Sequence, residues 1–198
     1  MPTQILGLGG SLRAGSGTVM ALNIALAGAE EQGARTRLMD LASLRLPLFN
    51  GSDGIDGYSS KEQAAITSLL DAVDEAQGVI LGSPTYHNTI SGSLKNALDF
   101  LEILREDGPS RFTGKIVGLT TVQGGGSGTG NNTLTTMLLA ARAMGAWVPP
   151  TIVSIPGGSD MFQEDSHHTD STIELRLRAL GAEVARASEM FSAYWSSI

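Results

Sequence analysis

The amino-acid sequence predicts a three-layer α/β fold in which helices cover both faces of a doubly wound, five-stranded parallel sheet. Five short runs of β-branched and aliphatic residues recur along the 198-residue chain. Segments with apolar residues at three- and four-residue spacing, which is the period of an amphipathic helix, separate these runs. Strands and helices that alternate in this way form right-handed βαβ crossovers, so the strands are expected to be parallel.

The predicted strands cover residues 5–9, 35–39, 79–81, 116–120 and 151–155. Four of them are short and nearly uncharged, as is usual for strands that are buried on both faces. The run over residues 35–39 alternates between charged and apolar side chains, which favours a position nearer the edge of the sheet.

The predicted helices each place apolar side chains on one face. The sets are Val19, Leu22, Leu26 and Ala29; Ile66, Leu69, Leu70 and Val73; Leu94, Ala97, Leu98 and Leu101; and, in a long terminal helix from Ile173, Leu177, Leu180, Val184, Ala187, Phe191 and Tyr194. Two segments rich in glycine and acidic residues, 51–58 and 157–170, are predicted to be exposed loops.

Length and composition limit the possible functions. A chain of 198 residues with no internal repeat or low-complexity linker is expected to form one domain over residues 1–198. It contains no cysteine, which excludes thiol nucleophiles, cysteine-ligated zinc, iron–sulfur clusters and dithiol relays within the chain. Any redox chemistry therefore needs a carried cofactor.

The charge of the chain argues against two classes of partner. The net charge is −7, and the 13 basic residues are scattered among 20 acidic ones, which disfavours nucleic acid and anionic membranes. The N-terminus does not resemble a signal peptide, and no apolar run approaches the ~20 residues that span a bilayer. We therefore expect a cytoplasmic protein that acts on small molecules.

A glycine-rich loop follows the first predicted strand, over residues 9–18, and leads into a helix. Such a turn directs backbone N–H groups and the positive end of the helix dipole, here around Gly17, at a phosphate. The loop fits neither a Walker motif, because Ser16 replaces the lysine, nor a dinucleotide motif, because Leu12 replaces the third glycine. Further donors are the hydroxyls of Ser11, Ser16 and Thr18 and the guanidinium of Arg13. Alternatively, Ser16 or Thr18 only caps the helix.

Two more loops follow the third and fourth predicted strands. Because parallel strands end at one edge of the sheet, these loops are expected to meet the first one there. The residues Pro84, Thr85, Tyr86 and His87 suit a wall for a planar ring, and Gln123, Gly124, Gly125 and Gly126 suit a close backbone approach. The alternatives are an ordinary turn and a flexible loop. A ligand with one phosphate and one planar ring system, such as FMN, fits the three loops together.

The sequence gives no support for other kinds of site. His167 and His168 lie in an acidic segment where solvation is a simpler explanation than metal binding. No spacing indicates a Ser/His/acid triad or an acid–base pair of carboxylates. We therefore predict no metal and assign no catalytic side chain, which is consistent with a cofactor that carries the chemistry.

Two motifs resemble the NADPH-dependent FMN reductase family of flavodoxin-like proteins. They are the Gly-Ser-Leu-Arg-x-x-Ser turn over residues 10–16 and the run Pro-Thr-Tyr-His-Asn-Thr-Ile-Ser-Gly-Ser-Leu-Lys-Asn-Ala-Leu-Asp over residues 84–99. The resemblance implies a strand order of 2-1-3-4-5, FMN and NAD(P)H as cofactors, and a homodimer or homotetramer with the helix over residues 92–104 at its interface. It also implies that the first loop holds the FMN phosphate and that the other two line the isoalloxazine. The chain departs from the common pattern of that family at Thr18 and His87, where many members have Asn, at Thr85, where many have Glu, and at Ser91, where many have Pro.

These features predict an NAD(P)H-dependent flavin oxidoreductase. It would transfer hydride from nicotinamide to FMN and then reduce a second acceptor, such as free flavin or a quinone. Two alternatives remain at this point. One is a flavodoxin-type electron carrier without pyridine-nucleotide activity, and the other is an FMN-dependent dehydrogenase of one biosynthetic metabolite.

Overall fold

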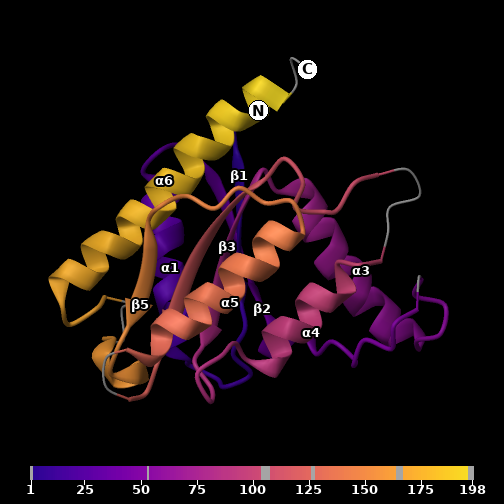
Figure 1. The fold of residues 1–198 in the computed structure, drawn as a ribbon, viewed down its shortest axis with the longest axis horizontal. Coiled ribbons are helices and arrows are strands. Elements are labelled where there is room, and N and C mark those ends of the chain that lie inside the picture. Colours follow the sequence, from indigo (N-terminus) through magenta and orange to yellow (C-terminus); the bar gives the residue numbers. More distant parts are fainter. Residues whose placement is uncertain (1, 53, 104–107, 126–127, 164–166, 196–198) are drawn as a thin grey trace.

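A computed structural model describes residues 2–52, 54–103, 108–125, 128–163 and 167–195. Five parallel strands form one sheet in the order β2-β1-β3-β4-β5 (Figure 1), which confirms the predicted fold class and strand order. The strands are β1 (Gln4–Gly9), β2 (Arg35–Asp40), β3 (Gly78–Pro84), β4 (Ile116–Val122) and β5 (Ile152–Ile155).

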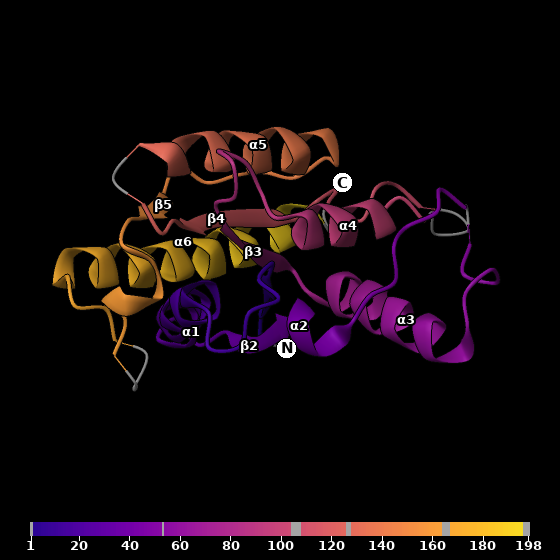
Figure 2. The ribbon, with the colours of Figure 1, turned by 90° about the horizontal axis from the view of Figure 1, so that it is seen from below.

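Helices cover both faces of this sheet. The first face packs against α1 (Gly17–Glu30) and α6 (Ser171–Trp195), and the second against α3 (Ser60–Glu75), α4 (Gly92–Phe100) and α5 (Thr129–Ala143). Figure 2 shows α1 and α5 on opposite sides of the molecule. Side chains of β1 alternate between the two cores, with Ile5 in one and Leu6 and Leu8 in the other.

The structure differs from the prediction in its helices. Helix α5 and the short α2 (Leu41–Leu44) were not predicted. The first turns of α5 are rich in glycine, asparagine and threonine, which are poor helix formers, although Leu134, Met137 and Ala141 recur at helical spacing and are buried. Helix α4 ends at Phe100 and is capped by Leu101, so it stops short of the predicted end at residue 104, which lies outside the described residues.

Helices α1 and α6 cross at very short range, and two glycines make this possible. A Cβ atom on Gly181 would lie 1.6 Å from the carbonyl oxygen of Ala25, and one on Gly28 would lie 2.2 Å from that of Arg178. No side chain fits at either position without moving a backbone. This crossing holds the long C-terminal helix against α1, whose N-terminus faces the candidate site.

The prediction of an exposed loop over residues 157–170 is wrong for part of the segment. A 3-10 helix, η1 (Gly158–Met161), starts the segment, and an isolated bridge pairs Phe162 with His168. Both side chains are buried, and their rings meet edge to face with centroids 4.9 Å apart. The segment packs on the sheet because Phe162 joins the core between α1 and α6. In the segment 51–58, most of the described residues are exposed, as predicted.

Among the helices that the structure describes, none combines the length and the hydropathy needed to cross a bilayer.

Candidate functional site

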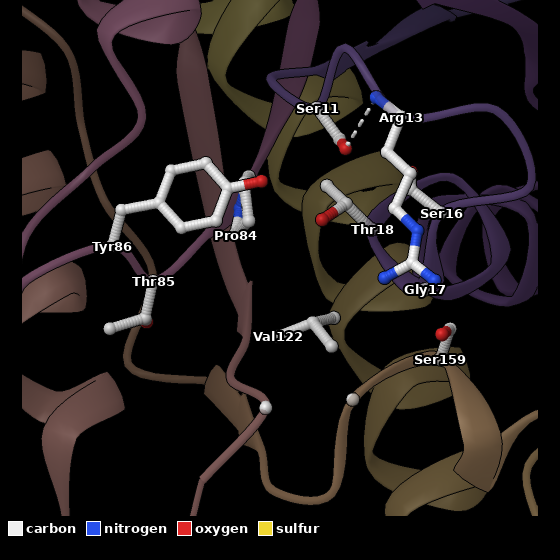
Figure 3. Close-up of a pocket in the computed structure, with 12 residues that line it drawn as sticks. Ser11, Arg13, Ser16, Gly17, Thr18, Pro84, Thr85, Tyr86, Val122 and Ser159 are labelled. Atoms are coloured by element: carbon white, nitrogen blue, oxygen red, sulfur yellow. Dashed lines mark hydrogen bonds between the residues drawn. The ribbon is translucent and has the colours of Figure 1, made fainter.

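A pocket opens at the carboxyl ends of β1, β3 and β4, where ligands bind in open α/β sheets. It contains about 510 Å³ of space, part of it open to solvent. Segments far apart in the sequence line it, as Figure 3 shows. The lining residues are Ser11, Arg13, Ser16, Gly17, Thr18, Pro84, Thr85, Tyr86, Val122, Gly124, Gly158 and Ser159.

Two buried serines on the first loop have hydroxyl protons that are available to a ligand. Ser11 Oγ accepts a hydrogen bond from the backbone N–H of Arg13 at 3.2 Å, and Ser16 Oγ accepts one from that of Val19 at 3.3 Å. Both oxygens act as acceptors in these bonds, so each hydroxyl still has its proton to donate. Ser16 therefore caps α1 and also lines the pocket, so it does more than cap the helix.

The N-terminus of α1 adds further donors. Within the described parts of the chain, the backbone N–H groups of Gly17 and Thr18 and the hydroxyl of Thr18 form no hydrogen bond, and Thr18 is buried. Arg13 is exposed, and Figure 3 shows its side chain extending along the pocket toward Ser159. Amides at a helix N-terminus, hydroxyl protons and a guanidinium are the donor set that a phosphate requires.

Hydroxyl groups at the start of α4 hold the first loop in place. The carbonyl oxygen of Gly10 accepts hydrogen bonds from Ser91 Oγ at 2.6 Å and Ser93 Oγ at 2.7 Å. The N–H of Gly10 donates to the carbonyl of Gly82 at 2.8 Å. A Cβ atom on Gly10 would lie 2.7 Å from that of Leu94, so this close approach requires glycine. The loop is consequently fixed to both β3 and α4.

The opposite wall of the pocket continues from β3. The N–H of Thr85 donates to the carbonyl of Val122 at 2.8 Å, which extends the pairing of β3 with β4. Figure 3 shows the ring of Tyr86 projecting over the pocket, with its hydroxyl on the side of Ser11 and Thr18. Tyr86 is 51% exposed, so one part of this wall is open to solvent and to a second ligand.

A chain of threonine hydroxyls lies behind this wall. Thr121 Oγ1 donates to the carbonyl of Ser83 at 2.8 Å, which uses its only proton. Thr85 Oγ1, which is 2.9 Å from both Thr121 Oγ1 and Thr133 Oγ1, therefore donates to the former and accepts from the latter. Thr121 and Thr133 are fully buried. The chain fixes the conformation of Thr85 from two neighbouring elements, β4 and α5.

The segment over residues 157–170 supplies the last side of the pocket through Gly158 and Ser159. The carboxylate of Glu174 holds the end of this segment, because it accepts hydrogen bonds from the N–H of His168 at 3.2 Å and from His167 Nδ1 at 2.9 Å. Burial raises the pKa of Glu174, but these two bonds and Arg178 outweigh it, so its pKa lies below the usual value. His167 is thus paired with a carboxylate. Among the described residues, no group of three or more His, Cys, Asp or Glu could hold a metal ion.

Comparison with known proteins identifies the family. The family model described as NADPH-dependent FMN reductase matches residues 3–160. The chain belongs to the NADPH-dependent FMN reductase family. It is 39% identical over 120 residues to an NADPH azoreductase from Bacillus sp. (strain OY1-2), a match that covers 61% of each chain. It is 31% identical over 97 residues to an NAD(P)H-dependent FMN reductase from Pseudomonas aeruginosa, covering 49% of each. The chain thus spans about half to three fifths of the length of these relatives.

A solved structure supports the flavodoxin-like fold. A flavodoxin from the domain Archaea superposes with a TM-score of 0.62 at 16% identity, covering 94% of this chain and 99% of that one. The family membership and the fold therefore agree with the predictions made from the residues 10–16 and 84–99, and FMN and NADPH are the cofactors that the family's description names.

In this FMN reductase family member, nine of the predicted site residues line the pocket: Ser11, Arg13, Ser16, Gly17, Thr18, Pro84, Thr85, Tyr86 and Gly124. His87 lies beside the pocket in a tight turn, where Tyr86 and Thr89 exchange two backbone hydrogen bonds of 3.0 Å and His87 has a φ of 48°. Gln123 is buried, and its N–H donates to the carbonyl of Ile155 at 2.9 Å. Gly125 is exposed outside the lining, and Gly126 lies outside the described residues.

Sequence reasoning missed five residues of the site: Val122, Gly158 and Ser159 in the lining, and Thr121 and Thr133 behind it. Thr121 and Val122 directly follow the predicted end of the fourth strand at residue 120, so a prediction that extended this strand to Val122 would have placed both at the edge of the sheet where the site lies. The other three come from segments whose approach to the site depends on the tertiary fold.

Proposed function

We propose that this protein is an NAD(P)H-dependent flavin oxidoreductase that holds FMN in the pocket described above. One observation supports the proposal most strongly. Hydrogen-bond donors that suit a phosphate lie on the first loop and on α1. Across a single pocket they face a wall formed by residues 84–86. The family membership and the names of the two relatives support the same function.

The residues of the first loop would hold the phosphate of FMN. Ser11, Ser16 and Thr18 have hydroxyl protons directed to no described protein acceptor, and Arg13 adds an exposed positive charge. The helix dipole of α1 contributes in the same direction. These groups are positioned before a ligand binds, because Ser91 and Ser93 fix the loop that carries them.

The residues of the other two loops would place the ring system. Pro84 and Thr85 are held against β4 by backbone and hydroxyl bonds, while the absence of a side chain at Gly124 lets a ring edge approach the backbone. FMN, when bound, supplies the ability to accept a hydride and pass electrons on. The half-exposed Tyr86 leaves an open side from which the nicotinamide and then the acceptor would enter.

The second acceptor belongs to the same proposal. Free flavin and quinones are expected acceptors, and the name of the Bacillus relative adds azo compounds. All of these are planar molecules that can occupy the open side of the pocket in turn with the nicotinamide. We further propose a homodimer that uses α4 and the neighbouring α5, on which Leu139 is 65% exposed; light scattering at micromolar concentration tests this.

Two measurements test the proposed function. The first is titration of the apoprotein with FMN, followed by the change in flavin fluorescence. The second is the oxidation of NADPH and NADH by the FMN-loaded protein with free FMN, a quinone or an azo dye as acceptor. We expect FMN binding and nucleotide oxidation with at least one acceptor. Absence of FMN binding refutes the proposal, and binding without nucleotide oxidation indicates the electron carrier instead.

A further inference from the structure

A second pocket lies against the same loop that forms the phosphate side of the first. Leu12 lines this pocket, while its neighbours Ser11 and Arg13 line the first one. The second pocket contains about 710 Å³ of space, part of it open to solvent, and its lining is mostly apolar. The residues are Leu12, Leu41, Ala42, Arg45, Leu46, Leu48, Gly92, Ser93 and Asn96.

The walls of the second pocket are fixed by hydrogen bonds. Asn96 Nδ2 donates to the carbonyl of Pro47 at 2.7 Å, and Asn96 Oδ1 accepts from the N–H of Phe49 at 2.9 Å. These bonds attach the segment that carries Leu46 and Leu48 to α4. Ser93 connects the pocket to the first loop through its bond to Gly10. The pocket is therefore preformed, although Leu12 and Leu48 are 64% and 82% exposed.

Arg45 is the charged residue of this lining. Within the part of the chain that the structure describes, its guanidinium makes no hydrogen bond or ion pair. Its backbone has a φ of 52° and closes α2 by donating its N–H to the carbonyl of Leu41 at 3.2 Å. Glycine is the favoured residue at such a helix end, and the left-handed conformation costs other residues roughly 1 kcal/mol. The side chain of Arg45 thus occupies a position that favours glycine without gaining a hydrogen bond or ion pair to the described residues.

The chemistry of this pocket selects a ligand with an apolar planar part and an anionic group. A free guanidinium recognises phosphate and carboxylate groups, and the leucines provide an apolar surface for a ring. The ligand should also extend to the first pocket, because a single loop separates the two. NADPH, which the proposed function requires as a substrate, meets these conditions: its nicotinamide must reach the first pocket, and its other end carries adenine and a 2′-phosphate.

We propose that the second pocket binds the adenosine end of NADPH and that Arg45 pairs with its 2′-phosphate, which makes the protein prefer NADPH to NADH. This inference rests on the proposed function. The net charge of the protein is −7, which repels an anionic nucleotide. A cation such as Arg45, which has no partner among the described residues, therefore contributes more to nucleotide binding here than it would on a neutral surface.

The variant Arg45→Gly tests this inference without the risk of misfolding. Glycine suits the left-handed backbone of residue 45, so the variant should unfold at the same temperature as the wild type or a higher one. Arg45→Lys keeps the charge but loses the paired donors, so its affinity for the 2′-phosphate should lie between those of the wild type and Arg45→Gly. Arg37→Gln is the matched control, because it also removes one positive charge but lies on β2, where Arg37 faces Glu75 at 3.8 Å.

The first measurement is calorimetric binding of 2′,5′-ADP and 5′-AMP, which does not depend on catalysis. We expect Arg45→Gly to weaken 2′,5′-ADP binding about tenfold, equivalent to about 1.4 kcal/mol, and to leave 5′-AMP binding and the affinity for FMN unchanged. The second measurement is steady-state kinetics. The KM for NADPH should rise about tenfold, while the values for NADH stay the same and Arg37→Gln behaves as the wild type.

Each failure has a distinct signature. If the wild type oxidises NADPH and Arg45→Gly has the same KM and the same affinity for 2′,5′-ADP, the assignment of Arg45 is overturned and the proposed function stands. Equal loss of 2′,5′-ADP and 5′-AMP binding also overturns recognition of the 2′-phosphate. If the wild type oxidises neither nucleotide with any acceptor, the proposed function itself fails.

Discussion

Removal of the Arg13 side chain should weaken the binding of FMN but not that of riboflavin. Arg13 lines the side of the pocket that we propose holds the phosphate, and it has no carboxylate partner among the described residues, so its charge is available to the ligand. A hydrogen bond to a charged group contributes about 1.5 to 3 kcal/mol. Arg13 is exposed, and solvent screening reduces such interactions. We therefore expect about 1.4 kcal/mol for Arg13→Ala, which is about a tenfold increase in Kd.

Comparison of the two flavins isolates the phosphate contact. Riboflavin shares the ring system and the ribityl chain with FMN but lacks the phosphate. Fluorescence titration of wild type and Arg13→Ala with both ligands forms a double-mutant cycle, in which the second change is made in the ligand. Arg35→Ala, at the start of β2, controls for the loss of one positive charge. The anchoring role of Arg13 is refuted if the substitution weakens the binding of both flavins equally, or if it does not change the affinity for FMN.

Ionic strength gives an independent check. An exposed guanidinium that pairs with a phosphate is screened by salt, since the Debye length falls from about 10 Å at 0.1 M to about 3 Å at 1 M. The difference in FMN affinity between the wild type and Arg13→Ala should consequently become smaller as salt is added. The contribution of the buried Ser11 and Ser16 hydroxyls to FMN affinity should depend less on the salt concentration. A difference that stays constant up to high salt would contradict an electrostatic origin.

Three further substitutions test other parts of the structure by unfolding measurements. Ser91→Ala removes the cap of α4 and one bond to the Gly10 carbonyl, and should lower the free energy of unfolding by about 1 to 2 kcal/mol in urea; an unchanged midpoint would show that Ser93 alone suffices. Gly181→Ala places a Cβ atom against the carbonyl of Ala25 and should cost about 3 kcal/mol, whereas Ala182→Gly nearby should cost no more than about 1 kcal/mol. The lowered pKa of Glu174 means that its ionised form stabilises the folded state above pH 4.5 and that this contribution is lost as pH falls below that value. Glu174→Gln should therefore lower the melting temperature at pH 7 more than at pH 4, and an equal decrease at both would argue against the ionised carboxylate.

The sequence predicted the sheet well because its information on the strands is local. Residues 5–9 and 116–120 are apolar runs between glycine-rich loops, and the alternation with helices determines parallel pairing. The first loop was equally clear, since its serines, threonine and arginine directly precede a helix. These local patterns placed Ser11, Arg13, Ser16 and Thr18 correctly beside one pocket.

The position of Gln123 shows why the rest was harder to predict. The fourth strand was expected to end at residue 120, but β4 continues to Val122 and the N–H of Gln123 still pairs with β5. Side chains alternate along a strand, so the strand end decides which of two neighbours faces a site. Val122 lines the pocket and Gln123 is buried. Likewise, the contribution of Ser159 depends on the burial of Phe162 and His168, which composition alone does not indicate.

Two positions where the chain departs from its family's common pattern share one physical explanation. Ser91 stands where the family resemblance has a proline. Its N–H donates to Ser83 Oγ at 3.0 Å and its hydroxyl donates to the carbonyl of Gly10; proline could form neither bond. Thr85 stands where the family resemblance has a glutamate, and its hydroxyl lies between those of Thr121 and Thr133. A carboxylate there would be desolvated beside two hydroxyls, one of which already donates elsewhere. At both positions this chain carries a hydroxyl group whose hydrogen bonds are formed with neighbouring elements. These hydroxyl groups therefore alter how the pocket wall is supported and leave the hydrogen-bond donors of the first loop in place.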